Sequence, residues 1–122
     1  PSNIETALKE SRWIAEAVVF GDKRPYLVAL ITLDPDEAPA LAAKLGIAPD
    51  RAAMATDEAV RAAIGAVVEE ANARFARIEQ IKRFAILPHD LTQAGGELTP
   101  TLKVKRRVVY DTYADVFDGL YE

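Results

Sequence analysis

The residue of this chain with the clearest potential for chemistry is Lys103, at the end of the polar segment 95–103, GGELTPTLK. Glycine takes a positive φ at little cost, so the glycine pair that opens the segment favours a chain reversal. Pro100 fixes its own φ and pushes Thr99 towards an extended backbone. The segment therefore predicts a lysine mounted on a stiff turn, and such a cation suits a negatively charged ligand.

Lys103 also belongs to a basic run with Lys105, Arg106 and Arg107, ahead of a predicted helix that starts near residue 104. The ordinary interpretation is a solvated surface, because most exposed charges do nothing specific. Cations at a helix N-terminus oppose the helix dipole, however, so helix stability alone does not favour this position. The run therefore favours, weakly, contact with an anion.

The same run could extend to Lys82 and Arg83 as a nucleic-acid surface. Such surfaces combine many cations with exposed aromatic side chains, whereas Tyr113 and Phe117 have the spacing of core residues. The formal net charge of −4 also argues against a nucleic-acid surface. We therefore predict no nucleic-acid partner.

The remaining polar candidates have structural interpretations. His89 next to Asp90 is expected in a solvated loop, because no serine or cysteine nucleophile accompanies it. The chain has no cysteine and one histidine, so we predict no metal site. The glycine pair lacks the spacing of a phosphate loop. The other acidic pairs and the tryptophan are assigned to turns, a solvated helix face and the core: Asp34, Asp36, Glu69, Glu70 and Trp13.

The 122 residues suffice for one domain with its own core. No apolar run reaches the roughly 18 residues that span a bilayer, and no signal peptide is visible, so a cytoplasmic domain is expected. The chain starts at Pro1, and Ser2 and Glu5 have the spacing of a helix capping box. A chain that opens on a helix cap is expected to be part of a longer protein.

Hydrophobic spacing predicts the elements that position Lys103. Helices are expected at 3–11, at about 36–45 with Gly46 as its stop, at 57–80, and from about 104 to the end. Strands are expected at 13–20, 26–33 and 81–87, the first two as an antiparallel hairpin with the second strand central. This order predicts an α+β fold, a small three-stranded antiparallel sheet that contains a β-hairpin and is covered by helices.

The segments 91–92 and 96–106 closely resemble the C-terminal signature of AMP-forming acyl-CoA synthetases. The likeness is greatest to the long-chain fatty acid branch, in which the Thr-Pro-Ser-Gly-Lys of the superfamily becomes Thr-Pro-Thr-x-Lys. Segment 1–5 is similar to the end of the family's hinge-following motif, and segment 20–26 resembles its first hairpin. The resemblance thus covers the whole chain in the family's order.

The resemblance implies that residues 1–122 are the mobile C-terminal domain of a fatty acid–CoA ligase and that the N-terminal domain lies outside them. Such enzymes use ATP with Mg²⁺ to form an acyl-adenylate, and coenzyme A then displaces AMP. Lys103 matches the catalytic lysine. The surrounding residues are expected to support its loop near the nucleotide: Gly96, Glu97, Thr99, Pro100 and Thr101. Only Lys103 receives a catalytic role, and residues 1–122 alone are expected to be inactive.

Two alternatives stay open. An acyl-AMP ligase that passes its product to a carrier protein would share the signature. A stand-alone anion-binding or interaction domain would share only the fold. Family members are often peripherally associated with membranes, so the resemblance also raises that expectation.

Overall fold

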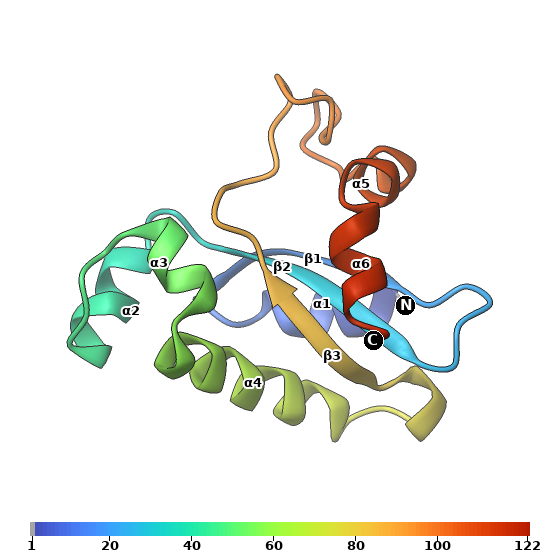
Figure 1. Cartoon of the computed structure of the whole chain (residues 1–122), viewed down its shortest axis with the longest axis horizontal. Coiled ribbons are helices and arrows are strands. Elements are labelled where there is room, and N and C mark those ends of the chain that lie inside the picture. Colours follow the sequence, from blue (N-terminus) through green and yellow to red (C-terminus); the bar gives the residue numbers. More distant parts are fainter. Residues whose placement is uncertain (1) are drawn as a thin grey trace.

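The computed structural model describes residues 2–122, which form a three-stranded sheet with helices on both faces (Figure 1). The strands are β1 (Ile14–Phe20), β2 (Leu27–Leu33) and β3 (Ile81–Ile86), in the order β1-β2-β3. β1 and β2 form the predicted antiparallel hairpin, in which Val18 lies opposite Leu30. The predicted central position of β2 is also confirmed.

Alternate residues of β2 enter two different cores, because successive strand side chains point to opposite faces. Ala29 and Ile31 belong to the larger core, beneath α1 (Ser2–Lys9), α2 (Ala38–Leu45), α3 (Arg51–Thr56) and α4 (Glu58–Asn72). Val28 and Leu30 belong to a smaller core with Val109 and Phe117. That second core lies under α5 (Arg106–Thr112) and α6 (Ala114–Gly119). The unbroken apolar run of β2 is what allows a strand to be covered on both sides.

The α+β class is confirmed, but the sheet is mixed rather than fully antiparallel. β3 pairs parallel to β2, with Leu30 beside Ala85. Parallel neighbours need a long crossover connection, and α2, α3 and α4 supply it between the two strands. The prediction of an antiparallel third strand is therefore wrong, because the sequence pattern indicates the strand but not its direction.

The helix predicted at 57–80 is too long. Asp57 caps its start as expected, accepting hydrogen bonds from the amides of Ala59 and Val60 at 2.8 and 3.1 Å. The helix ends at Asn72, whose side-chain amide donates to the carbonyl of Ile81 and accepts from its amide, both at 2.9 Å. A short 3-10 helix, η1 (Arg77–Glu79), follows, and its Ile78 side chain is 85% exposed.

Other elements also differ from the sequence prediction. α1 ends at Lys9 rather than at residue 11. α3 occupies a segment for which no helix was predicted, and Asp50 caps it by accepting from the amide of Ala52 at 3.1 Å. The last helix starts at Arg106 rather than Val104 and is divided at Tyr113 into α5 and α6. The predicted stop of α2 is confirmed, since Gly46 has a φ of 72°.

Candidate functional site

The loop between β3 and α5 projects beyond the sheet (orange in Figure 1). Lys103 lies in this loop, three residues before the start of α5. Thr92 organises the first half of the loop. The carbonyl of Thr92 accepts from the amides of Glu97 and Leu98 at 3.0 and 3.2 Å, and its hydroxyl accepts from Gly95 at 2.9 Å. Gly96 has a φ of 79°, which closes the reversal in a conformation that favours glycine. The predicted glycine reversal is confirmed.

A second turn, from Thr99 to Lys103, presents the lysine. The amide of Thr99 donates to the carbonyl of Lys103 at 2.8 Å, and the amide of Lys103 donates to the Thr99 hydroxyl at 3.0 Å. The amide of Leu102 donates to the Thr99 carbonyl at 2.8 Å, and Leu102 has a φ of 64°. The Thr99 hydroxyl also lies 3.1 Å from that of Thr101. Thr99 is therefore the residue that closes this turn.

The side chain of Gln93 ties the two turns together. Its Nε2 donates to the carbonyls of Thr99 and Pro100 at 3.1 and 3.0 Å. Beyond the turn, Leu98 and Val104 form an isolated antiparallel bridge, so Val104 is extended rather than helical. Hydrogen bonds hold the backbone around Lys103 in the turn, and the helix begins three residues after it.

Lys103 is exposed and, within residues 2–122, forms no ion pair. It borders a shallow groove of about 220 Å³ between the loop, α1 and β1. Two further cations line that groove, but both are paired: Lys9 with Glu16 at 3.5 Å, and Arg106 with Glu5. Lys103 thus remains available to an anion from outside these residues.

Glu97 holds the first half of the loop against the helices. It is only 5% exposed, and its carboxylate accepts from the amide of Thr92 at 3.1 Å and from the hydroxyl of Tyr113. Burial and this contact with Glu97 both raise the pKa of Tyr113. Tyr113 lies at the junction of α5 and α6, so the buried carboxylate connects the loop to that junction.

Glu5 fixes the other end of the loop. This carboxylate is 6% exposed; it accepts from the amide of Val19 and from Nη1 of Arg106, both at 2.7 Å, and from Nη2 of Arg106 as well. The hydrogen bond with Glu5 raises the pKa of Arg106. Glu5 had been predicted as half of a capping box; the side chain of Ser2, its other half, lies outside the described side chains. The structure gives Glu5 partners on β1 and α5 instead.

Sequence reasoning missed Glu5, Arg106, Tyr113 and Gln93 as supports of the loop. The burial of Glu5 could have been inferred from the sequence, because Glu5 is next to Ile4 on the face of α1 where Ile4 and Leu8 are buried. Arg106 had been placed in a run of exposed cations at a helix N-terminus. Of that run, Lys103 and Lys105 precede the helix, and Arg106 is neutralised by Glu5.

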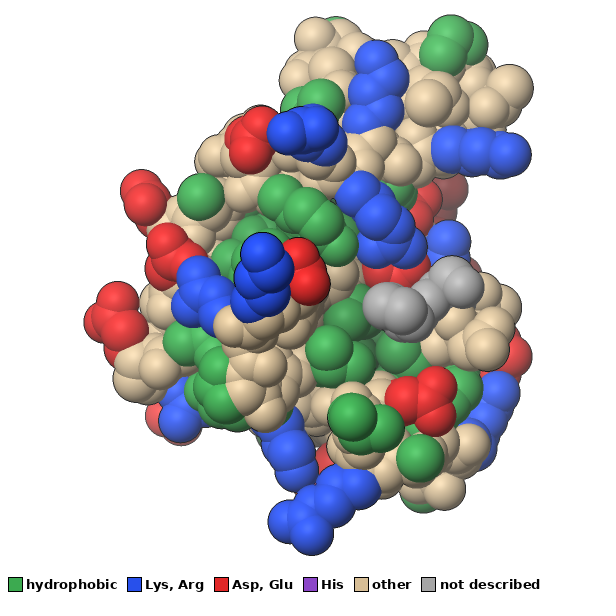
Figure 2. All heavy atoms as spheres, turned by 90° about the vertical axis from the view of Figure 1, so that its right-hand side faces the viewer, with side chains coloured by type: hydrophobic (Ala, Val, Ile, Leu, Met, Phe, Trp, Pro, Cys, Tyr) green, Lys and Arg blue, Asp and Glu red, His purple; other side chains and the backbone are tan. Residues whose placement is uncertain are grey.

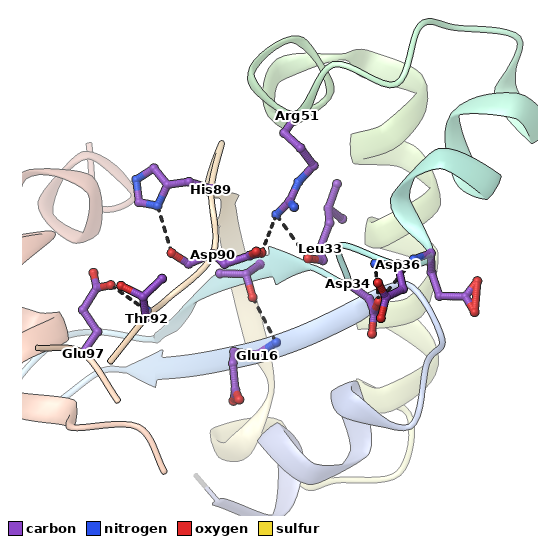
Figure 3. Close-up of polar contacts among 11 residues, drawn as sticks. Glu16, Leu33, Asp34, Asp36, Arg51, His89, Asp90, Thr92 and Glu97 are labelled. Carbon is purple, nitrogen blue, oxygen red and sulfur yellow. Dashed lines mark hydrogen bonds and ion pairs between the residues drawn. The ribbon is translucent and has the colours of Figure 1, made fainter. Parts of the chain in front are cut away.

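The polar residues that follow β2 and β3 bond to other parts of the fold (Figure 3). Nδ1 of His89 lies 3.1 Å from the backbone carbonyl of Asp90, whereas the Asp90 carboxylate accepts from Arg51 at 2.9 Å. Arg51 also donates to the carbonyl of Leu33 at 3.2 Å, which joins α3 to the end of β2. Asp34 accepts from the amides of Asp36 and Glu37, so its predicted role in a turn is confirmed. No acid–base pair forms between His89 and Asp90.

Basic side chains are dispersed on the face that Figure 2 shows. Separate blue groups alternate there with acidic and hydrophobic side chains. Phe117 is buried, and Tyr113 is partly buried in the same core, as predicted. Among residues 2–122, no three acidic or histidine side chains are grouped as a metal site. No helix in that range has the length and apolarity needed to cross a bilayer.

Replacing Tyr113 by phenylalanine is expected to lower the free energy of unfolding by about 2 kcal/mol, because it removes a donor from the buried Glu97 carboxylate. Urea unfolding at pH 7 measures this change. Tyr110→Phe is the matched control, since its hydroxyl donates to a backbone carbonyl, that of Val19, at 2.7 Å. An equal loss in both variants would contradict a special role for the bond to Glu97.

Stability is also expected to fall above about pH 10, where an unfolded tyrosine loses its proton. The raised pKa of Tyr113 keeps the folded state protonated there, so the unfolded state binds fewer protons and is favoured as the pH rises. The stabilisation is complete below that pH. Tyr113→Phe should therefore lose less stability between pH 9 and pH 11 than the parent chain, and equal slopes would contradict the assignment.

Residues 1–122 match the family model of the AMP-binding enzyme C-terminal domain along their whole length, so the chain belongs to this family. It is 38% identical over 129 residues to the long-chain-fatty-acid–CoA ligase FadD15 of Mycobacterium tuberculosis; the match covers 99% of this chain and 20% of that protein. The long-chain-fatty-acid–CoA ligase ACSBG2 of Gallus gallus is 36% identical over 140 residues, covering 99% of this chain and 18% of that protein.

A similar solved structure is that of the A-PCP didomain of carboxylic acid reductase from Segniliparus rugosus in complex with AMP. The TM-score is 0.76 at 26% identity, and the match covers 98% of this chain and 15% of that chain. The chain thus spans about a fifth of the length of the curated relatives it matches. The resemblance expected from the Lys103 segment is confirmed at the level of the family.

Proposed function

We propose that this chain is the C-terminal domain of a long-chain fatty acid–CoA ligase and that it supplies Lys103 to acyl-adenylate formation. The observation that carries the proposal is the Thr99–Lys103 turn, which presents an exposed, unpaired lysine on a backbone held by hydrogen bonds. The names of the relatives support the substrate class. Gly96, Glu97, Thr99, Pro100 and Thr101 support the turn in this proposal.

In the proposed reaction, an oxygen of the fatty acid carboxylate attacks the α-phosphorus of ATP, and pyrophosphate leaves. Carboxylate and triphosphate are both anionic, so they repel each other as they approach. A fixed cation between them offsets this repulsion and aligns the attack. Lysine suits the position as a compact charge on a long stem, whereas the planar guanidinium of arginine requires another geometry.

In the second step, the thiol of coenzyme A attacks the acyl carbonyl and AMP leaves. Lys103 has no role there, and in the proposal the domain turns to present another face. The described residues offer no grouped carboxylates for Mg²⁺. The proposal therefore assigns Mg²⁺ and most of the ATP site to the N-terminal domain, and residues 1–122 alone are expected to be inactive. We also propose that the protein is cytoplasmic and contacts membranes peripherally.

The test is a product assay of the full-length protein with palmitate, ATP and Mg²⁺. Palmitoyl-CoA and AMP should form when coenzyme A is present, and pyrophosphate should be released. Formation of palmitoyl-adenylate that is transferred only to a carrier protein would favour the acyl-AMP ligase alternative. Release of no pyrophosphate with any fatty acid would overturn the proposal and favour a stand-alone binding domain.

A further inference from the structure

Leu102, immediately before Lys103, has a backbone conformation that its residue type disfavours. Its φ of 64° is in the left-handed region, which costs residues with a Cβ free energy and costs glycine almost nothing. Lys23 is the other non-glycine residue with a positive φ within residues 2–122. Asparagine and glycine are the residues that usually occupy such positions.

The hydrogen bonds of the turn explain the backbone of Leu102 but not its side chain. The three bonds between Thr99 and residues 102 and 103 require a tight reversal, which a glycine would also complete. The leucine side chain is 62% exposed and belongs to neither hydrophobic core. Within the described chain, the strain is therefore not offset by burial.

The exposed side chain forms a ridge between two shallow grooves of about 220 Å³ each. One is the groove beside Lys103, and the other is lined mainly by apolar side chains, among them Leu91 and Leu98. A strained, exposed and apolar residue one position before the proposed catalytic group indicates a contact that forms only in another state of the protein. The relatives supply a partner for that contact, because about four fifths of their length lies outside the match.

We infer that Leu102 is a positioning residue, an apolar anchor that packs against the N-terminal domain of the ligase when Lys103 enters the active site. The inference rests on the proposed function. The anchor would fix the orientation of the turn at the moment of adenylation. The leucine is buried in the closed state and not in the separated domains. An enzyme that binds its substrates while open would therefore gain this stabilisation on the way to the transition state, which raises kcat.

The test uses the full-length ligase with Leu102→Asn and Leu102→Gly, both of which accept the left-handed backbone, and with Leu102→Met, which keeps an apolar side chain. In the adenylation half-reaction we expect kcat to fall about tenfold or more for the first two variants, the effect of losing one buried leucine. The KM values for ATP and palmitate should change little. Leu102→Met should stay within about threefold of the parent.

Thermal unfolding of the 122-residue chain distinguishes a positioning role of Leu102 from a purely structural one. Leu102→Asn should leave the unfolding temperature unchanged or raise it by up to about 4 °C, because it relieves strain. Activity thus falls while stability is kept or increased. Lys23→Gly is the matched control, since it relieves a similar backbone conformation in the β1–β2 turn and should leave adenylation unchanged.

The inference is overturned if Leu102→Asn and Leu102→Gly keep the parental kcat, if Leu102→Asn lowers the unfolding temperature, or if Lys23→Gly loses adenylation equally. Lys103→Ala separates this failure from failure of the proposed function. A Lys103→Ala variant that still adenylates overturns the role of the lysine itself. A variant series in which Lys103→Ala is inactive and Leu102→Asn is normal overturns only the anchor.

Discussion

Replacing Lys103 by alanine should lower the rate of acyl-adenylate formation by the proposed full-length ligase about 100-fold or more. Removing one preorganised group that stabilises developing charge typically costs this much. The turn would remain intact, because its bonds use the backbone of residue 103 and the Thr99 hydroxyl. Release of pyrophosphate from ATP and palmitate measures the effect. Thioester formation from supplied palmitoyl-adenylate and coenzyme A should be largely retained.

The control is Lys105→Ala, which removes an exposed cation two residues further along the chain. Its backbone amide, which donates to the carbonyl of Glu97 at 2.8 Å, is unaffected. We expect adenylation within about twofold of the parent. Equal loss of both half-reactions in Lys103→Ala would show that the lysine is not specific to adenylation. Equal loss in Lys105→Ala would indicate a general charge effect.

Replacing Arg106 by alanine should lower the free energy of unfolding by about 3 kcal/mol. Breaking an ion pair while one charge stays buried is costly, and the Glu5 carboxylate would keep only the Val19 amide as a partner. Breaking a buried ion pair typically costs about 3–5 kcal/mol. The Arg106 side chain is 42% exposed, so we expect a loss of stability at the lower end of that range. Urea unfolding of the 122-residue chain measures the loss as a lower midpoint at an unchanged slope.

Arg107→Ala provides the matched comparison, since Arg107 is exposed and adjacent. Its effect should stay within about 0.5 kcal/mol. If the two variants were equally stable, the contact between Glu5 and Arg106 would contribute nothing to holding the loop. Glu5→Gln should lie between them, because glutamine keeps an acceptor for the Val19 amide and loses the charge.

Local sequence rules predicted the hairpin, the central strand, the stop of α2 and the start of α4 correctly because those features depend on neighbouring residues. Gly46 ends α2 and Asp57 starts α4 through conformations and bonds within a few residues. The direction of β3 depends on how a 47-residue connection crosses the sheet, and no local pattern encodes it. Hydrophobic spacing likewise extended the predicted helix to residue 80, although α4 ends at Asn72, whose side chain bonds to Ile81.

For the site, the sequence located the turn and Lys103, but not what holds them. The two turns of the loop are encoded locally, the first by Gly96 at a positive φ and the second by the hydroxyl of Thr99. Its supports come from elsewhere: Arg106 pairs with a residue 101 positions earlier. Pairings at such separation cannot be deduced from the periodicity of one chain. Nothing in the sequence indicated the strain at Leu102 either, because leucine is not a residue type associated with a left-handed backbone.

The contact between Glu5 and Arg106 also has a consequence for synthesis, because the two residues are 101 positions apart. The ribosome adds Glu5 well before Arg106, so the ion pair can form only after the segment between them has been made. Until then the loop that bears Lys103 lacks its support from α1 and β1. That support thus becomes available only late in the synthesis of this domain.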